Sequence, residues 1–147
     1  MVKVIDKLLI IGQAPGKPKE GQGPCEAFCS ASPSGKRIRA VLGDDHDYVN
    51  LLLYYPGRGD SNHPKGHHWP VAEARCQAEL MLPTLQGRKV VFAGRNVADA
   101  FGINSPWLTW AWGLGFKMIV VPHPSGVNRW WNSPENLLKL REAMQNG

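Results

Sequence analysis

The sequence contains few cysteines, three in 147 residues, and no long uninterrupted apolar run. Three cysteines argue against the disulfide framework that stabilises small secreted domains. No stretch reaches the roughly 18 apolar residues of a membrane-spanning helix, and the N-terminus lacks the basic-then-apolar layout of a signal peptide. We therefore expect a soluble, cytoplasmic (intracellular) protein that has no membrane partner.

A zinc site is one alternative use for the cysteines, because two of them have a C-x3-C spacing and the third follows a histidine-rich segment. The residues concerned are Cys25, Cys29, Cys76, His63, His67 and His68. We favour the interpretation that the protein binds no metal.

The length and net charge of the chain indicate its domain organisation and the kind of partner it binds. At 147 residues with 43% hydrophobic side chains, residues 1–147 are expected to form a single domain with its own core. The net charge of +5 and the pI near 9.3 favour an anionic partner, of which nucleic acid is the commonest, although a solvated basic surface is the alternative. Many basic residues fall in or beside loops: Lys17, Lys19, Lys36, Arg37, Arg39, Arg58, Lys65 and Arg129.

Apolar runs alternate with segments of helical periodicity. The runs predict four strands, at Leu8 to Ile11, Tyr48 to Tyr54, Lys89 to Ala93 and Phe116 to Val121. Helices are expected at Lys36 to Leu42, Val71 to Leu85, Asn96 to Phe101 and Ser133 to about Met144. This order predicts an α/β fold with three layers, α/β/α, around a central four-stranded parallel sheet.

An indole-rich segment, Gly102 to Gly115, separates the last two predicted strands. It holds Trp107, Trp110 and Trp112, which are expected to pack over a sheet edge, with lining of a cleft as the alternative.

Two glycine- and proline-bearing loops follow predicted strands. Gly12 to Gly16 (GQAPG) follows the first strand, and His123 to Arg129 (HPSGVNR) follows the last. Open α/β sheets place their ligands at the carboxyl ends of the strands, so the two loops predict one shared site.

These loops also resemble the two signature motifs of the uracil-DNA glycosylase superfamily. GQAPG is similar to the first motif, nearest to a branch with Glu-Ala-Pro-Gly, and HPSGVN is similar to the second, which enters the DNA minor groove. With YVNLLLYYPG and KVVFAGRNVADAF between them, the resemblance covers nearly the whole chain. It implies the three-layer fold of that superfamily and DNA as the partner.

The resemblance also bears on cofactors. Some glycosylases of the superfamily hold an iron–sulfur cluster on four cysteines, two of them ahead of the first motif, whereas here only Cys76 matches a cluster position. We therefore expect no cofactor, no metal and a monomer.

Removing a base from DNA requires donors for the charge that builds on the leaving base, a stacking partner and a positioned water. His123 is the first candidate to donate to the base O2. Backbone N–H groups of Gln13 and Ala14 can reach the same oxygen, while Pro15 and Gly16, after Gly12, fix the turn.

Two further residues are predicted to bind the base. Asn50 offers a donor and an acceptor to one edge of a pyrimidine, as an asparagine does at this strand end in the resembled superfamily. Phe28 is assigned by resemblance as the ring that stacks on the flipped base, although GPCEAFC departs from the usual Pro-Phe pair.

The second loop supplies the predicted DNA contacts. The amides of Ser125 and Gly126 are expected to bind phosphates, with Asn128 and Arg129 beside them. Val127 is the predicted apolar wedge that fills the space left by the flipped base. Valine is small for this role.

Ala14 is the main departure from the superfamily, because related enzymes use aspartate or asparagine there to position water. The catalytic candidates are therefore His123, Gln13 and Glu26, with Glu20 as a second carboxylate that could hold the water. Both carboxylates could equally be solvated surface groups, and charge stabilisation alone is a further alternative.

Three functions are compatible with these residues. The leading hypothesis is a monofunctional glycosylase that removes uracil from DNA. The second is a glycosylase for a 5-substituted or bulky pyrimidine, such as a modified cytosine in viral DNA, because Cys25 to Ser34 is rich in small residues. The third is a non-catalytic DNA-binding module of the same fold that lost turnover with Ala14.

Overall fold

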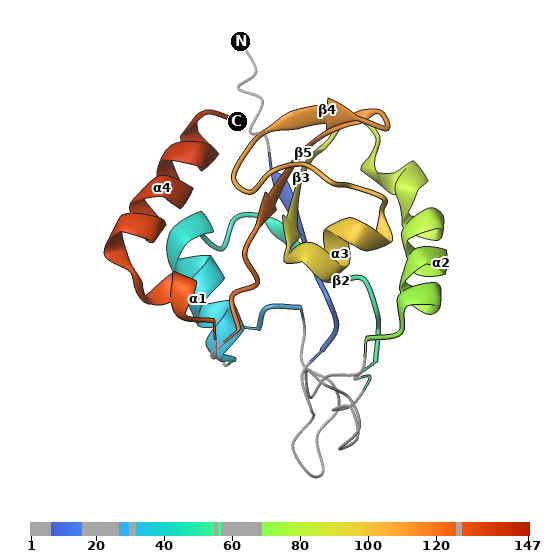
Figure 1. Ribbon diagram of the computed structural model, residues 1–147, viewed down its shortest axis with the longest axis horizontal. Coiled ribbons are helices and arrows are strands. Elements are labelled where there is room, and N and C mark those ends of the chain that lie inside the picture. The colour runs from blue at the N-terminus through green and yellow to red at the C-terminus, as the bar shows by residue number, and fades with distance from the viewer. Residues whose placement is uncertain (1–6, 16–26, 30–31, 55, 57–68, 126–127) are drawn as a thin grey trace.

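The fold is built around a five-stranded sheet (Figure 1). The computed structural model describes residues 7–15, 27–29, 32–54, 56, 69–125 and 128–147. The strand order is β2-β1-β3-β5-β4. The strands are β1 Leu8–Gly12, β2 Asp47–Asn50, β3 Lys89–Ala93, β4 Ala111–Gly113 and β5 Phe116–Val121. Strands β1, β2, β3 and β5 pair in parallel, as predicted.

The prediction of four strands is wrong by one. Ala111–Gly113 forms a short strand that pairs antiparallel with β5, within the segment expected to be a loop. Leu114 and Gly115 both have positive φ, at 55° and 89°, as the tightest hairpin turns require. A leucine in such a turn lacks the usual Asn-Gly signal, so the sequence pattern does not predict this hairpin.

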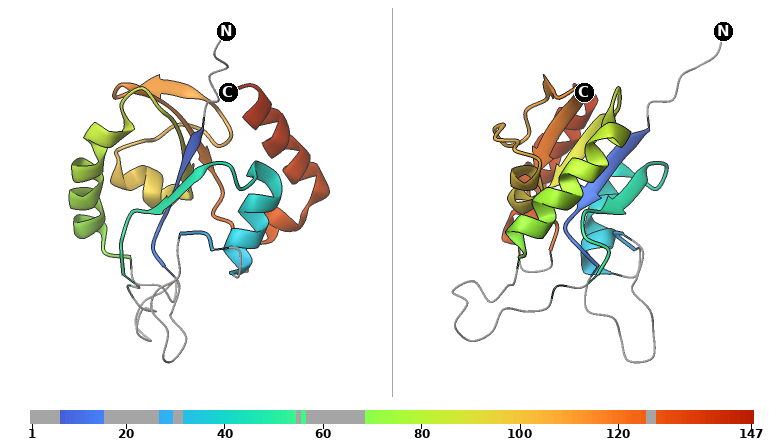
Figure 2. Two further views of the ribbon diagram at one scale, coloured as in Figure 1. Left: turned by 180° about the vertical axis from the view of Figure 1, so that it is seen from behind. Right: turned by 90° about the vertical axis from the view of Figure 1, so that its right-hand side faces the viewer.

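Helices cover both faces of the sheet. They are α1 Pro33–Leu42, α2 Val71–Met81, α3 Arg95–Ala100 and α4 Pro134–Gln145, with short 3-10 helices η1 Leu82–Leu85 and η2 Arg129–Asn132. Ser32 and Ser133 cap α1 and α4 by accepting hydrogen bonds from the first turn of each helix. Helices α1 and α4 lie on one face, and α2 and α3 lie on the other (Figures 1 and 2).

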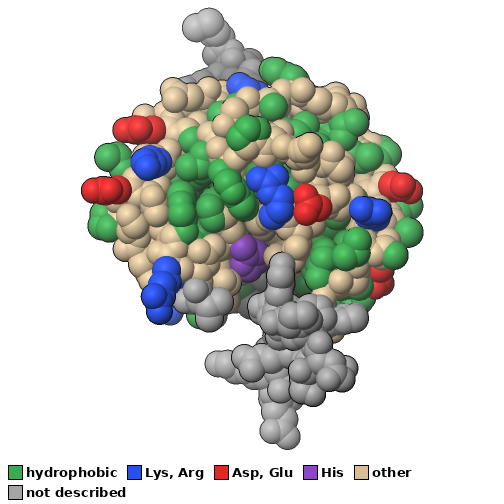
Figure 3. Space-filling view, viewed as in Figure 1, with side chains coloured by type: hydrophobic (Ala, Val, Ile, Leu, Met, Phe, Trp, Pro, Cys, Tyr) green, Lys and Arg blue, Asp and Glu red, His purple; other side chains and the backbone are tan. Residues whose placement is uncertain are grey.

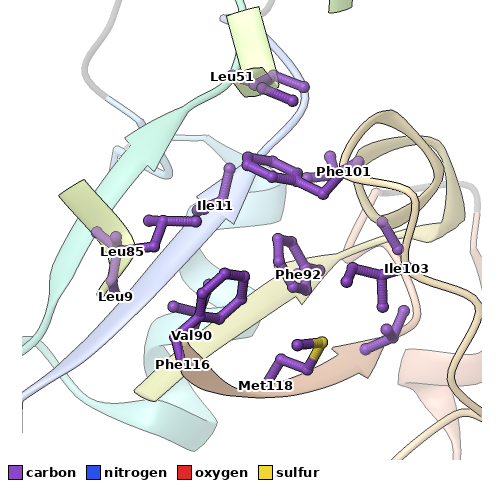
Figure 4. Packing of buried hydrophobic residues seen from close by; sticks show 14 of the residues in the cluster. Leu9, Ile11, Leu51, Leu85, Val90, Phe92, Phe101, Ile103, Phe116 and Met118 are labelled. Atoms are coloured by element: carbon purple, nitrogen blue, oxygen red, sulfur yellow. The ribbon is translucent and has the colours of Figure 1, made fainter. Parts of the chain in front are cut away.

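The core is divided by the sheet into two apolar clusters. Successive residues of β1 and β3 point to opposite faces, so Ile11 and Phe92 pack under α2 and α3, whereas Ile10 and Val91 pack under α1 and α4. Figure 4 shows the first cluster, with Phe92 in contact with the rings of Phe101 and Phe116. Burial on both faces explains why these strands are apolar throughout.

The second predicted strand is shorter than expected. Only Asp47–Asn50 belongs to β2, and of the residues after it Leu51 and Leu52 are buried and Leu53 is exposed. Backbone bonds from Leu51 and Leu52 to the carbonyl oxygens of Gly12 and Gln13 continue the pairing past the strand ends. Asn50 therefore lies at the edge where the first loop begins.

The carboxyl ends of the parallel strands share one edge of the sheet, the lower edge in Figure 1.

None of the helices in the described ranges is both long and apolar enough to span a bilayer.

Candidate active site

Three strand ends bring Gln13, Gly94 and His123 together. Gln13 follows β1, Gly94 follows β3 and His123 lies two residues after β5. A Cβ atom added at Gly94 would lie 3.1 Å from the His123 Cβ and 3.6 Å from the Gln13 Nε2. The side chains of Gln13 and His123 therefore flank the Gly94 backbone, which adopts a φ of 108°.

The base-binding candidates Phe28 and Asn50 meet at Gly12. Asn50 is paired with Gly12 in the β1–β2 register. A Cβ atom on Gly12 would lie 2.6 Å from two Phe28 ring carbons and 3.0 Å from the Asn50 Oδ1. Only glycine lets the ring and the amide approach the strand so closely, so Gly12, Phe28 and Asn50 lie against one another.

The Phe28 backbone is held in an unfavourable conformation. Its φ of 49° lies in the left-handed region, which a bulky residue rarely adopts. The Arg39 Nε donates a hydrogen bond of 2.6 Å to the Phe28 carbonyl, and the Phe28 ring packs edge-on against Tyr48 at 5.9 Å. The surrounding structure thus fixes the ring, which is 8% exposed, over Gly12.

The Arg39 side chain makes its contacts within the protein. Its guanidinium stacks over the Tyr48 ring at 4.1 Å and forms an ion pair with Asp44 at 3.1 Å. Burial raises the pKa of Tyr48 to about 12, so its hydroxyl stays protonated and donates to the Gly43 carbonyl at 2.7 Å. Arg39 therefore supports Phe28, although its position in the sequence suggested a DNA contact.

His123 is oriented by the loop that follows it. The backbone N–H of Ser125 donates to the His123 Nδ1 at 3.1 Å, and the Asn128 Nδ2 donates to the His123 carbonyl at 2.7 Å. Because Nδ1 accepts a hydrogen bond, the proton of the neutral imidazole resides on Nε2. The ring therefore presents Nε2–H as a donor.

Arg37 from α1 fastens this loop on both sides. One terminal nitrogen donates to the carbonyl oxygens of Ser125 and Asn128, at 2.8 and 3.1 Å, and the other donates to the Asn132 Oδ1 at 2.8 Å. Both nitrogens are thus engaged within the protein. From the sequence, Arg37 was recognised only as a basic residue in or beside a loop. Its partners lie about 90 positions away in the chain, so sequence patterns could not identify them.

The site geometry can now be set beside known proteins. A sequence profile of the Uracil DNA glycosylase superfamily matches residues 3–145, nearly the whole chain. The chain belongs to the uracil DNA glycosylase superfamily. A comparison with curated proteins finds no match.

Membership of the superfamily agrees with the mixed α/β fold and with the resemblance carried by the two loops. The structure brings together Gly12, Gln13, Ala14, Pro15, Phe28, Asn50 and His123 near one edge of the sheet. Ser125 and Asn128 lie beside His123, and Arg129 is exposed at the start of η2.

Several predicted residues lie outside the described residues. These are Gly16, Glu20, Glu26, Gly126 and Val127, together with Lys17, Lys19, Cys25, Arg58, His63, Lys65, His67 and His68.

The cysteines differ from expectation. Three cysteines predicted no disulfide framework, but Cys29 is disulfide-bonded, whereas Cys76 is free and exposed. A cysteine in a disulfide has no thiolate to offer a metal, so the C-x3-C spacing does not supply zinc with Cys29.

The tryptophans of the indole-rich segment divide into two groups. Trp110 packs against the core and donates its indole N–H to the Ala143 carbonyl at 2.6 Å, as expected for packing over a sheet edge. Trp107 and Trp112 are exposed by 46% and 73%. The cleft alternative therefore stays open for Trp107, which lies near His123.

Proposed function

We propose that this protein is a monofunctional DNA glycosylase that flips a pyrimidine, uracil, out of DNA and hydrolyses its N-glycosidic bond. The carrying observation is the meeting of Gln13, Phe28, Asn50 and His123 at one sheet edge in a member of a superfamily whose enzymes generally act in this way. The product is an abasic site, and the partner is DNA.

The proposed role of His123 follows from its hydrogen bonds. Glycosidic bond cleavage leaves negative charge on the base, and a fixed donor near the base O2 stabilises that charge. The Ser125 amide donates to Nδ1 and so fixes the tautomer of the neutral imidazole that carries its proton on Nε2. Loss of one preorganised donor of this kind costs about 100- to 1000-fold in rate.

Base recognition is assigned to Asn50 and Phe28. The Asn50 amide can pair with one edge of a pyrimidine, while the Phe28 ring offers a stacking face. Backbone N–H groups of Gln13 and Ala14 are proposed as further donors. The strained, braced conformation of Phe28 supports a role in holding a ligand, since such strain gathers at binding sites.

Ala14 cannot position the attacking water, because it has no polar side chain. The Gln13 side chain approaches the same Gly94 backbone as His123 and carries both a donor and an acceptor, so we assign it to the attacking water. Glu26 is the alternative carboxylate and lies outside the described residues.

A modified pyrimidine is the second candidate substrate. A hollow of about 740 Å³ opens along the outer side of β2 and reaches Pro15, Ala27 and Asn50. Space of this kind beside the Asn50 amide could hold a substituent on the pyrimidine ring that uracil lacks.

Base release from matched oligonucleotides separates these functions. The panel contains uracil, hypoxanthine, thymine mismatches and 5-modified cytosines, and strand breaks after alkali report each abasic product. Release of uracil supports the leading proposal, and release of modified bases alone supports the second. DNA binding without abasic product on any base would contradict both and indicate a non-catalytic DNA-binding module.

A further inference from the structure

A separate cavity of about 440 Å³ adjoins His123, and neither Phe28 nor Asn50 lines it. Its walls include Arg95, Trp107, Leu108, Trp130 and His123, and they are mainly apolar. We call it the Trp107 pocket. Its volume falls within the range of about 300–1,000 Å³ that is common for ligand sites.

The Trp107 ring is held in place rather than buried. Trp107 forms an isolated bridge with Val120, and the next residue, Leu108, donates its backbone N–H to the Val120 carbonyl at 2.9 Å. The Arg95 guanidinium lies over the ring at 4.4 Å and also donates to the Ser105 carbonyl. Trp107 is fixed in this way and remains 46% exposed as a residue, which suits a side chain that stacks on a ligand.

Charge and shape narrow the choice of occupant. The face shown in Figure 3 carries hydrophobic side chains next to a histidine, and basic side chains with an acidic side chain beside them. An exposed aromatic side chain, Trp107, with the Arg95 guanidinium over its ring matches an apolar, planar group that carries a neighbouring negative charge. A nucleobase and its phosphate have this combination.

We propose that the Trp107 pocket binds the base of the nucleotide next to the flipped one, on the same strand. The inference rests on the proposed function, because His123 lines both the pocket and the reaction site. Two sites that share one side chain suit adjacent nucleotides. A base within a duplex has both faces stacked, so the pocket accepts its base when the DNA is single-stranded or locally opened.

The experiment pairs a protein change with a substrate change. Trp107→Ala removes the ring, and Trp112→Ala is the matched control, because Trp112 is an exposed tryptophan of β4 outside the pocket. Single-stranded oligonucleotides carry one uracil, and each nucleotide on either side is replaced in turn by an abasic one. The measured quantity is kcat/KM for uracil release.

Trp107→Ala should lower kcat/KM about tenfold on the oligonucleotide that carries both flanking bases. A loss of this size is within the range that stacking of a base on an aromatic side chain contributes. The loss should vanish on the oligonucleotide that lacks the base at one flanking position, and Trp112→Ala should behave like the wild type on all of them. No loss with Trp107→Ala, or an equal loss on every oligonucleotide, would overturn the pocket's assignment.

Failure of the glycosylase proposal gives a different result. In that case the wild type releases no base from any oligonucleotide. The affinities of the wild type and Trp107→Ala for the same oligonucleotides are then measured by fluorescence anisotropy. The difference in affinity between the two proteins should disappear on the oligonucleotide that is abasic at one of the flanking positions. An affinity difference that no abasic position removes would overturn the pocket by this second measurement.

Discussion

Gly12 is the residue on which the candidate base site depends most closely. The Phe28 ring and the Asn50 amide both press against its backbone, at distances that leave no room for a methyl group. The requirement is steric and local. It also explains why a glycine ends β1 even though that strand is otherwise apolar.

Gly12→Ala should therefore disturb the site more than the fold. The new methyl group must displace the Phe28 ring, and overpacking of this kind costs about 1–3 kcal/mol. We expect uracil release to fall at least tenfold, with a lowered but cooperative thermal unfolding transition. Single-turnover kinetics and circular dichroism measure the two effects.

Gly113→Ala is the matched control for this substitution. A methyl group there meets only the flexible end of Met118, at 3.2 Å, on β4 and away from the loops. It should leave the rate of base release unchanged. Equal activity of Gly12→Ala and the wild type would show that Phe28 and Asn50 do not act from the positions described.

At the scale of elements, α1 supports both the second loop and Phe28. Arg37 binds the carbonyl oxygens of the second loop, and Arg39, two residues on, binds the Phe28 carbonyl. Gly35 at the start of the helix packs directly under the backbone of Phe28 and Cys29. A single helix thus fixes the stacking ring and the His123 loop relative to each other.

Arg37→Met tests this support. Methionine keeps much of the apolar stem but removes the hydrogen bonds that fasten Ser125 and Asn128. Because the Ser125 amide orients His123, the rate of the chemical step should fall about tenfold, while KM changes little. Single-turnover rates across a range of DNA concentrations separate these two quantities.

Lys36→Met removes a neighbouring exposed positive charge as a control. It should affect DNA affinity alone, with an unchanged single-turnover rate at saturating DNA. If Lys36→Met lowered the chemical step as much as Arg37→Met does, the loss would reflect charge on α1 and not the bracing of the loop.

Sequence patterns predicted the sheet well where burial acts on both faces. The apolar runs of β1, β3 and β5 are visible because helices cover both sides. The hairpin of β4 could not be predicted, since it has three residues and a leucine in its turn. The predicted strand from Tyr48 to Tyr54 is too long because Leu51 and Leu52 are buried in the core outside the sheet.

The candidate site was predicted in part. Phe28, Asn50, His123 and the two loops were proposed from motifs and resemblance, and those of their residues that the structure describes lie near the same edge of the sheet. The bracing by Arg37 and Arg39 could not be predicted, because a basic residue near a loop gives the same pattern whether it faces DNA or the protein. The Trp107 pocket likewise depends on contacts between segments that are distant in the sequence.

At the scale of the whole molecule, the positive charge should govern DNA affinity. The net charge is +5, and exposed basic residues such as Lys36 and Arg129 lie on or near the loop edge. Phosphate contacts release counterions, so a protein that covers about three phosphates of duplex DNA loses roughly 40-fold in affinity between 50 and 200 mM salt.

Titration of DNA binding against salt checks this expectation. The logarithm of the affinity should fall linearly with the logarithm of salt concentration, and an oligonucleotide with uncharged methylphosphonate linkages should show little dependence. Salt-independent binding to ordinary DNA would mean that the positive charge of the protein does not contact the phosphates.

The most direct test of the proposed function is the single-turnover rate of uracil release by the wild type and by His123→Ala, measured with their affinities for the same DNA. A donor fixed by the Ser125 amide and aimed at the base predicts a loss of about 100- to 1000-fold in rate with nearly unchanged affinity. Full activity of His123→Ala would contradict the account.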